Sequence, residues 1–311
     1  MIRSLHHVTA TVAGAQADLD FYVGLLGLRL VKQTVNFDNH HVFHFYYGDE
    51  WGTPGTIMTT FPYAGMGVPA GRKGAGQITA TAFAVPAGSL SAWRARLAEH
   101  GVAVTGEGTR FGEPFLAFDD PSSLAIELIE VGAEGRSPWA SGSVDRAIAI
   151  RGLHSVTLSL RETGRSLALL TGPLGYTVAT TDGARTRVAV GQGGAGSWLD
   201  LLHAPDAPAG VNGLGTVHHV AMAIGTEEEQ LAIRERLMGL GIGVTEVRDR
   251  QYFKSIYFRE PGGVLYEIAT VAPGFAVDEP LSELGRSLKL PPWEEPHRSG
   301  IEAGLPPVSH P

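Results

Sequence analysis

Four segments of this sequence repeat one order of expected elements: a strand, an amphipathic helix, and shorter strands of which the last is apolar. The segments begin near Leu5, Gln77, Arg151 and Gly215. Such a repeat restricts the fold strongly, because each copy must form the same supersecondary unit. One βαβββ unit cannot cover both faces of its own sheet, so the units should pair edge to edge. We therefore predict an α+β protein in which four βαβββ modules pair into two barrel-like halves, each with a concave inner face.

The breaks between the segments predict the organisation of the chain. Residues 1–135 are expected to hold the first pair of modules, residues 150–272 the second pair, and residues 273–311 a Pro-rich tail that packs on the body. The expected helices are Ala15–Gly24, Ser89–His100, Glu162–Leu170 and Glu227–Leu240. Gly101 and Gly241 stand where a helix C-terminus favours a left-handed residue.

Composition excludes several classes of function. The chain has 311 residues, a net charge of −8 and no cysteine, so disulfides, thiolate metal ligands and cysteine nucleophiles are absent. No basic run is long enough to follow a phosphate backbone, and no apolar run approaches about 20 residues, so neither nucleic acid nor membrane is expected as a partner. The N-terminus has no signal-peptide pattern, and we expect a cytoplasmic homo-oligomer.

Two histidine doublets, His6-His7 and His218-His219, open the first and fourth segments. Aligning the four segments places His7, Ala80, His154 and His219 at one position, and Thr59, Glu127, Asp200 and Glu267 at another. Only the fourth segment has both a histidine and a glutamate, so a metal site there needs one more histidine, from His7 or His154. Two imidazoles and one carboxylate with open positions suit Fe(II) and dioxygen, and Mn(II) or zinc also fits by ligand type.

Other interpretations of these residues were weighed. A strand histidine is more often a half-buried residue than a ligand, and Glu127 and Glu267 could each pair with an arginine. The recurrence of the doublet at equivalent places favours the metal. A second histidine cluster near a turn (His40, His41 and His44) is expected to form a solvent edge or pocket wall rather than a second metal site.

The sequence resembles the vicinal oxygen chelate superfamily, which includes glyoxalase I, bleomycin-resistance proteins and extradiol ring-cleaving dioxygenases. Within it, the chain is similar to para-hydroquinone ring-cleaving dioxygenases. The similarity runs nearly end to end and is carried by Leu5–Thr9, Phe21–Leu28, Leu30–Asp38, Thr53–Phe61, Arg250–Arg259 and Leu288–Pro292. The resemblance implies an Fe(II)-dependent enzyme of aromatic compound degradation that opens hydroquinone or substituted hydroquinones with incorporation of O2.

The resemblance also implies roles for individual residues. His7, His219 and Glu267 would bind the iron, and five others would lie around it or line the substrate pocket: His6, Thr9, His218, Arg250 and Tyr257. In regular strands His6 and His218 would point away from the pocket, so a β-bulge is needed to bring them in. Arg250 could instead pair with Asp249 on the surface, and Tyr257 could be an ordinary strand residue.

Three alternatives remain at this level. A catechol-type extradiol dioxygenase would use His154, His219 and Glu267, although His154 is followed by Ser155 and lacks a doublet partner, which favours His7. A metal-free module that binds a planar drug would not need two histidines and a glutamate. A glyoxalase-like isomerase usually has more carboxylate ligands than these segments offer.

Overall fold

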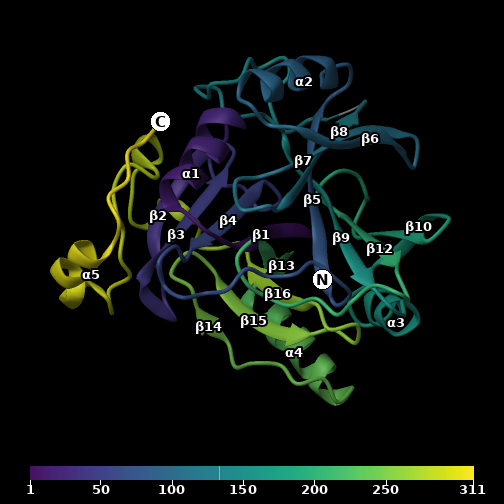
Figure 1. The fold of residues 1–311 in the computed structure, drawn as a ribbon. Helices are drawn as coiled ribbons and strands as arrows, with labels where there is room; N and C mark the ends of the chain where they lie inside the picture. Colours follow the sequence, from purple (N-terminus) through teal and green to yellow (C-terminus); the bar gives the residue numbers. More distant parts are fainter. Residues whose placement is uncertain (133) are drawn as a thin grey trace.

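Two curved eight-stranded sheets form the body of the protein (Figure 1). The computed structural model describes residues 1–132 and 134–311. The strand order is β14-β15-β16-β13-β1-β4-β3-β2 in one sheet and β10-β11-β12-β9-β5-β8-β7-β6 in the other. No helix in this described part of the chain is both long and apolar enough to cross a membrane.

Each module contributes one helix and four strands. The first consists of β1 (Ser4–Val12), α1 (Ala15–Leu19), β2 (Arg29–Asn36), β3 (Asn39–Gly48) and β4 (Ile57–Pro62). The second consists of β5 (Gln77–Pro86), α2 (Leu90–Glu99), β6 (Val104–Arg110), β7 (Glu113–Asp119) and β8 (Ala125–Val131). The third consists of β9 (Gly152–Leu160), α3 (Gly164–Thr171), β10 (Thr177–Asp182), β11 (Arg185–Ala189) and β12 (Trp198–His203). The fourth consists of β13 (Thr216–Ile224), α4 (Glu227–Gly239), β14 (Arg248–Asp249), β15 (Lys254–Arg259) and β16 (Leu265–Thr270).

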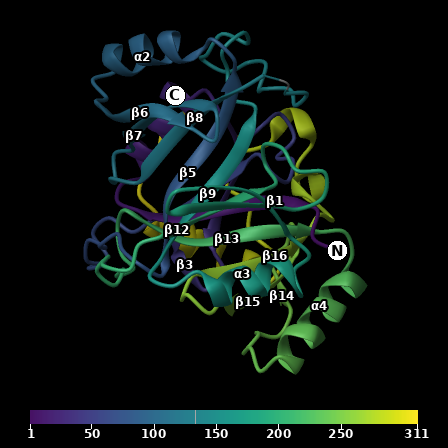
Figure 2. The same cartoon turned by 90° about the vertical axis from the view of Figure 1, so that its right-hand side faces the viewer.

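The sheets join modules that are distant in sequence. β1 pairs antiparallel with β13, and β5 pairs antiparallel with β9. The predicted fold class, four βαβββ modules in two barrel-like halves, is confirmed. The bounds 1–135 and 150–272 stay a prediction, but the pairing of consecutive modules within them was wrong. The first module shares a sheet with the fourth, and the second with the third. Figure 2 shows β1 and β13 lying side by side across the molecule.

The helices lie close to their predicted positions. α4 begins after Thr226, whose side chain accepts a hydrogen bond from the Glu229 backbone, and three glutamates occupy its first turn, where the helix dipole favours negative charge. Gly241 follows its end with a positive φ of 77°, as predicted. The first helix differs, because α1 ends at Leu19 and continues as a π-helical segment, Asp20–Leu25.

The C-terminal residues run along the outer side of the first module (Figure 1). They contain short 3-10 turns and one helix: Phe275–Val277, Leu281–Glu283, Glu295–His297 and α5 (Arg298–Gly304). Leu288 forms a bridge with Gln33 of β2, and the Lys289 backbone donates to the Gln33 carbonyl. Leu290 and Ile301 bury their side chains against Val35. The free edge of β2 is thereby covered.

Candidate metal site

Both histidine doublets lie at β-bulges. In the pairing of β1 with β13, Leu5 lies opposite Met222 and His7 opposite Ala221, so His6 has no partner. Further along the same pair, Thr9 lies opposite His219 and Ala10 opposite Val217, so His218 has none. An extra residue in a strand turns neighbouring side chains towards the same side. The structure thus contains the irregularity that the sequence required at both doublets.

Three buried side chains converge on the inner face of this sheet. His7 Nε2 and His219 Nε2 lie 3.3 Å apart, and they lie 3.3 and 2.7 Å from Glu267 Oε2. Their exposed fractions are 2%, 5% and 0%. Within the described residues this is the only group of three or more potential ligands close enough to hold one ion. His7 comes from β1, whereas His219 and Glu267 come from β13 and β16, so the first and fourth modules share this site.

The donor atoms fit a divalent metal. Glu267 Oε1 accepts a hydrogen bond from the Ser255 hydroxyl, but Oε2 is fully buried and accepts none from the described residues. A buried carboxylate oxygen without a donor is costly unless a cation is present. Burial alone would raise the pKa of Glu267, yet His7 and His219 hold it well below its usual value. The carboxylate is therefore ionised and faces two imidazole nitrogens, which is a suitable ligand set for Fe(II), Mn(II) or zinc.

The second histidine of each doublet contacts the first. His6 Nδ1 lies 2.9 Å from His7 Nδ1, and His218 Nδ1 lies 2.7 Å from His219 Nδ1. These hydrogen bonds occupy the Nδ1 atoms of His7 and His219 and leave both Nε2 atoms directed at Glu267. Outer partners of this kind orient metal-binding imidazoles. Burial, assisted by His7, lowers the pKa of His6 to about 3, so its ring is neutral.

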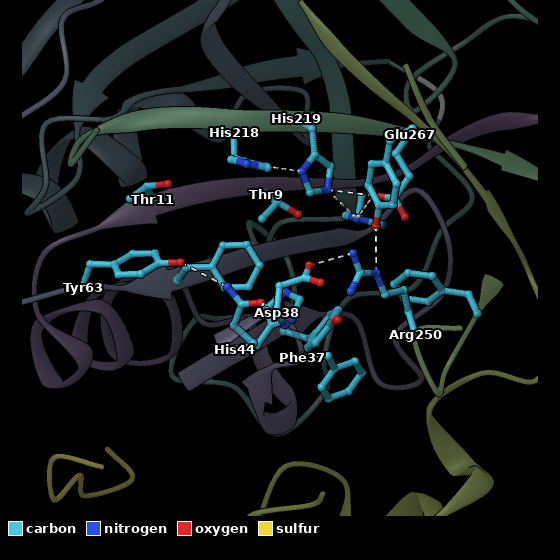
Figure 3. Close-up of a pocket in the computed structure, with 16 residues that line it drawn as sticks. Thr9, Thr11, Phe37, Asp38, His44, Tyr63, His218, His219, Arg250 and Glu267 are labelled. Atoms are coloured by element: carbon cyan, nitrogen blue, oxygen red, sulfur yellow. Dashed lines mark hydrogen bonds and ion pairs between the residues drawn. The ribbon is translucent and has the colours of Figure 1, made fainter. Parts of the chain in front are cut away.

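A cavity of about 260 Å³ opens beside the three converging side chains. Its volume suits a ligand of one aromatic ring better than a drug-sized molecule. Four of the five residues predicted to surround the metal line it, namely Thr9, His218, Arg250 and Tyr257, whereas His6 lies behind His7. His44 also lines it, so the pocket-wall prediction is confirmed for this residue (Figure 3).

Arg250 is held at the pocket by two groups. Its Nε donates to the Tyr257 hydroxyl at 3.1 Å, and its Nη2 lies 3.0 Å from Asp38 Oδ2 (Figure 3). The partner is thus Asp38, from the β2–β3 turn, and not Asp249. The nearby Tyr257 and Asp38 raise the pKa of Arg250 despite its burial. Tyr257 accepts from Arg250, and its own hydroxyl hydrogen has no acceptor among the described residues, so it can point into the pocket.

His154 does not occupy a ligand position. β9 has the same bulge as β13, since Ala82 pairs with Ser155 and Phe83 with Leu153. His154 is therefore the counterpart of His218, and Ser155 is the counterpart of His219. The sequence alignment was wrong by one residue in this module, and a slip of one residue places a side chain on the other face. His154 instead contacts Ser155 and Glu113.

Sequence reasoning missed three polar residues at this site. Ser255 donates to Glu267, Asp38 holds Arg250, and Thr59 lies between Thr9 and His44. Ser255 has a detectable signal, because it lies two residues before Tyr257 and so shares its strand face. Asp38 lies in a turn, where alternation gives no direction.

Comparison with known proteins identifies the family of the chain. The model of the Glyoxalase/Bleomycin resistance protein/Dioxygenase superfamily matches residues 4–128 and 152–268. The chain is 43% identical to "Putative ring-cleaving dioxygenase MhqO" of Bacillus subtilis over 97% of its length and 96% of the relative. It is 38% identical to the chlorohydroquinone/hydroquinone 1,2-dioxygenase of Sphingobium indicum, covering 94% of this chain and 93% of that one.

Solved structures show the same fold. A crystal structure of a "putative dioxygenase" from Bacillus subtilis has a TM-score of 0.94 at 42% identity and covers 100% of this chain and 98% of its own. Glyoxalase I from Zea mays has a TM-score of 0.65 at 15% identity, covers 87% of this chain and 93% of its own, and supports the fold alone. Because the family model spans both module pairs and these relatives match nearly end to end, the protein belongs to the glyoxalase/bleomycin resistance protein/dioxygenase superfamily.

Proposed function

We propose that the protein is an Fe(II)-dependent ring-cleaving dioxygenase that opens hydroquinone or a substituted hydroquinone beside a hydroxyl-bearing carbon. The convergence of His7, His219 and Glu267 in a single-ring cavity carries this proposal. The hydroquinone dioxygenase named among its relatives supports the choice of a para-diol. A catechol-type ligand set would need His154, which contacts Glu113 in the other sheet.

The iron would offer positions for one diol oxygen and for dioxygen, and it would pass electrons between them. The reaction breaks the ring bond between a hydroxyl-bearing carbon and its neighbour. Both atoms of dioxygen enter the product, where they complete a carboxyl group and an aldehyde. The diol supplies the electrons, so no further reductant is needed.

The side chains around the cavity provide the remaining functions in this proposal. Arg250 places a fixed positive charge where it stabilises a deprotonated diol, and Tyr257 offers its hydroxyl hydrogen to a ligand oxygen. His218 lies at the cavity with its Nδ1 facing the Nδ1 of His219, so its neutral ring carries its hydrogen on Nε2 and can donate it to an oxygen of the ligand. His6 has a supporting role behind His7, because it fixes the ring orientation of that ligand.

The test is anaerobic loading with Fe(II), followed by measurement of dioxygen uptake with hydroquinone, methylhydroquinone, chlorohydroquinone and catechol. We expect one metal per chain and uptake with the three para-diols. Uptake with catechol alone would refute the substrate choice. Stoichiometric metal without uptake on any diol would favour an isomerase, and absence of bound metal would favour a binding module.

A matched pair of histidine variants separates the two ligand sets. His7→Gln should lose most of its bound metal and its activity, because it removes one of the three ligands. His154→Gln should keep both, since His154 lies in the other sheet, where its ring nitrogens face Ser155 and Glu113. The opposite pattern, with metal lost in His154→Gln and kept in His7→Gln, would support the catechol-type arrangement instead.

A further inference from the structure

Thr59 occupies the position in the first module that Glu267 occupies in the fourth. In the pairing of β1 with β4, Thr9 lies opposite Thr59, just as Ala221 lies opposite Glu267 in the pairing of β13 with β16. Thr59 is fully buried. A hydroxyl group therefore occupies the position at which the symmetry of the modules would allow a fourth metal ligand. Its hydrogen bonds indicate a different role.

The donor and the acceptor can be assigned in both hydrogen bonds of the Thr59 hydroxyl. Its Oγ1 donates to Thr9 Oγ1 at 2.9 Å, and a hydroxyl has only one proton to donate. His44 Nε2 lies 2.9 Å from the same Oγ1, so this nitrogen must carry a proton and donate to Thr59. Burial lowers the pKa of His44 well below its usual value, which agrees with a neutral ring protonated at Nε2.

Thr9 stands at the end of this chain of donors. Its oxygen accepts from Thr59, and its own hydrogen has no acceptor among the described residues. Thr9 follows His7 by two residues and lies opposite His219 in the sheet, and all three line the same cavity (Figure 3). The free hydrogen of Thr9 is thus available to an oxygen bound in that cavity.

We propose that His44 and Thr59 are positioning residues that direct the hydroxyl hydrogen of Thr9 towards the deprotonated oxygen of a bound phenol. This inference rests on the proposed function, which supplies the phenolic ligand. The sequence of donors runs from His44 through Thr59 to Thr9 and then to the ligand, and each bond strengthens the next. Without Thr59, the Thr9 hydroxyl can rotate and offer a lone pair instead of its hydrogen.

The test uses zinc-loaded protein and 4-nitrophenol, whose absorbance distinguishes phenol from phenolate and which needs no dioxygen chemistry. Thr59→Val keeps the shape of the side chain and removes its oxygen, whereas Thr59→Ser keeps the oxygen. We expect Thr59→Val to bind the phenolate about tenfold more weakly and to raise its apparent pKa, because the Thr9 hydroxyl is no longer held with its hydrogen towards the charged oxygen. Thr59→Ser should stay within about threefold of the wild type.

Variants of His44 and Thr9 complete the design. His44→Phe should weaken phenolate binding as Thr59→Val does, and His44→Gln should restore much of it, since an amide can donate to Thr59. Thr9→Val should lose at least as much as either. All variants should bind one zinc per chain, because Thr59 is not a ligand.

Two results would overturn the inference. The first is that Thr59→Val binds the phenolate as tightly as the wild type while Thr9→Val binds it more weakly. The second is that the wild type binds no phenolate. Failure of the proposed function is a separate result, because that test measures dioxygen uptake by the iron form. In the iron form, Thr59→Val should raise KM for hydroquinone more than it lowers kcat, since the bond forms as soon as the phenolate binds.

Discussion

Replacing Lys32 with methionine should remove a buried ionic contact that holds the C-terminal residues against β2. The Lys32 ammonium is fully buried in β2 and lies 2.6 Å from Asp278 Oδ1. It also contacts Glu279, and its Nζ lies 5.0 Å from the centre of the Tyr252 ring. Methionine is nearly isosteric with lysine but carries no charge. Lys32→Met therefore leaves both carboxylates without their cation and changes little else.

The structure indicates a large cost. Removing one partner of a buried ion pair costs about 3–5 kcal/mol, because a charge remains buried without compensation. Glu279 is only 3% exposed. Asp278 keeps the Tyr252 hydroxyl as a donor at 2.9 Å, and Glu279 keeps Ser287 at 3.2 Å. These remaining donors place our expectation at the lower end, about 3 kcal/mol.

Urea unfolding of the metal-free protein, followed by tryptophan fluorescence, measures this loss. Lys73→Met is the matched control, because Lys73 and Asp119 are both more than a third exposed and lie 3.5 Å apart. Such a surface pair contributes about 0–1 kcal/mol. Adding Glu279→Gln to Lys32→Met should recover part of the loss. The reasoning is refuted if Lys32→Met costs no more than Lys73→Met, or if Glu279→Gln gives no recovery.

Three further predictions concern the site and its support. Ser255→Ala should weaken metal binding about 10–100-fold, because Glu267 loses the hydrogen-bond donor that orients it. Titration calorimetry measures this affinity, and an unchanged value would contradict the prediction. Asp38→Asn should raise KM for hydroquinone about 3–10-fold, because Arg250 loses the carboxylate that positions it. The free energy of unfolding should change by less than about 1 kcal/mol, since Asp38 is exposed. An unchanged KM would argue against this role of Asp38. Burial raises the pKa of Asp18 from 3.8 to about 7. The folded state therefore binds the proton of this carboxyl group more tightly than the unfolded state, and the contribution of Asp18 to stability should be lost as pH rises from about 4 to about 7. Asp18→Asn should remove that slope in thermal melts, and parallel curves would contradict this assignment.

The repeat was enough to predict the modules and most of their elements. Each module reuses the same alternation of strand, helix and strands, so the pattern appears four times and errors in one copy are visible in another. The pairing of Thr9 with Thr59 and of Ala221 with Glu267 follows the alignment made from sequence. The sequence did not predict which modules share a sheet, because that depends on contacts between strands that are far apart in the chain, such as β1 and β13.

The bulges explain where sequence reasoning failed. Regular alternation places His6 and His218 on the outer face of the sheet. The sequence therefore indicated that a bulge was needed, but it did not determine which residue of each strand is the extra one. In the third module the same bulge falls at His154, and the alignment then assigned the ligand position to His154 when it belongs to Ser155. A lone histidine offers no doublet against which to check the register, whereas His6-His7 and His218-His219 do.

The second sheet shows how a buried carboxylate is neutralised without a metal among the described residues. Arg187 lies opposite Asp200 in the pairing of β11 with β12, where Tyr257 lies opposite Glu267 in the pairing of β15 with β16. Its guanidinium donates to both oxygens of Asp200, at 2.7 and 2.9 Å.

Glu127 is satisfied in the same way, because Arg110 donates to both of its oxygens. The alternative considered from sequence, a glutamate paired with an arginine, is therefore correct for Glu127. Glu267 has no arginine partner among the described residues and faces His7 and His219 instead. A buried carboxylate requires a cation in either sheet. Guanidinium groups supply it in the second sheet, and in the first the tyrosine at the arginine position leaves the carboxylate available for the metal ion that we propose.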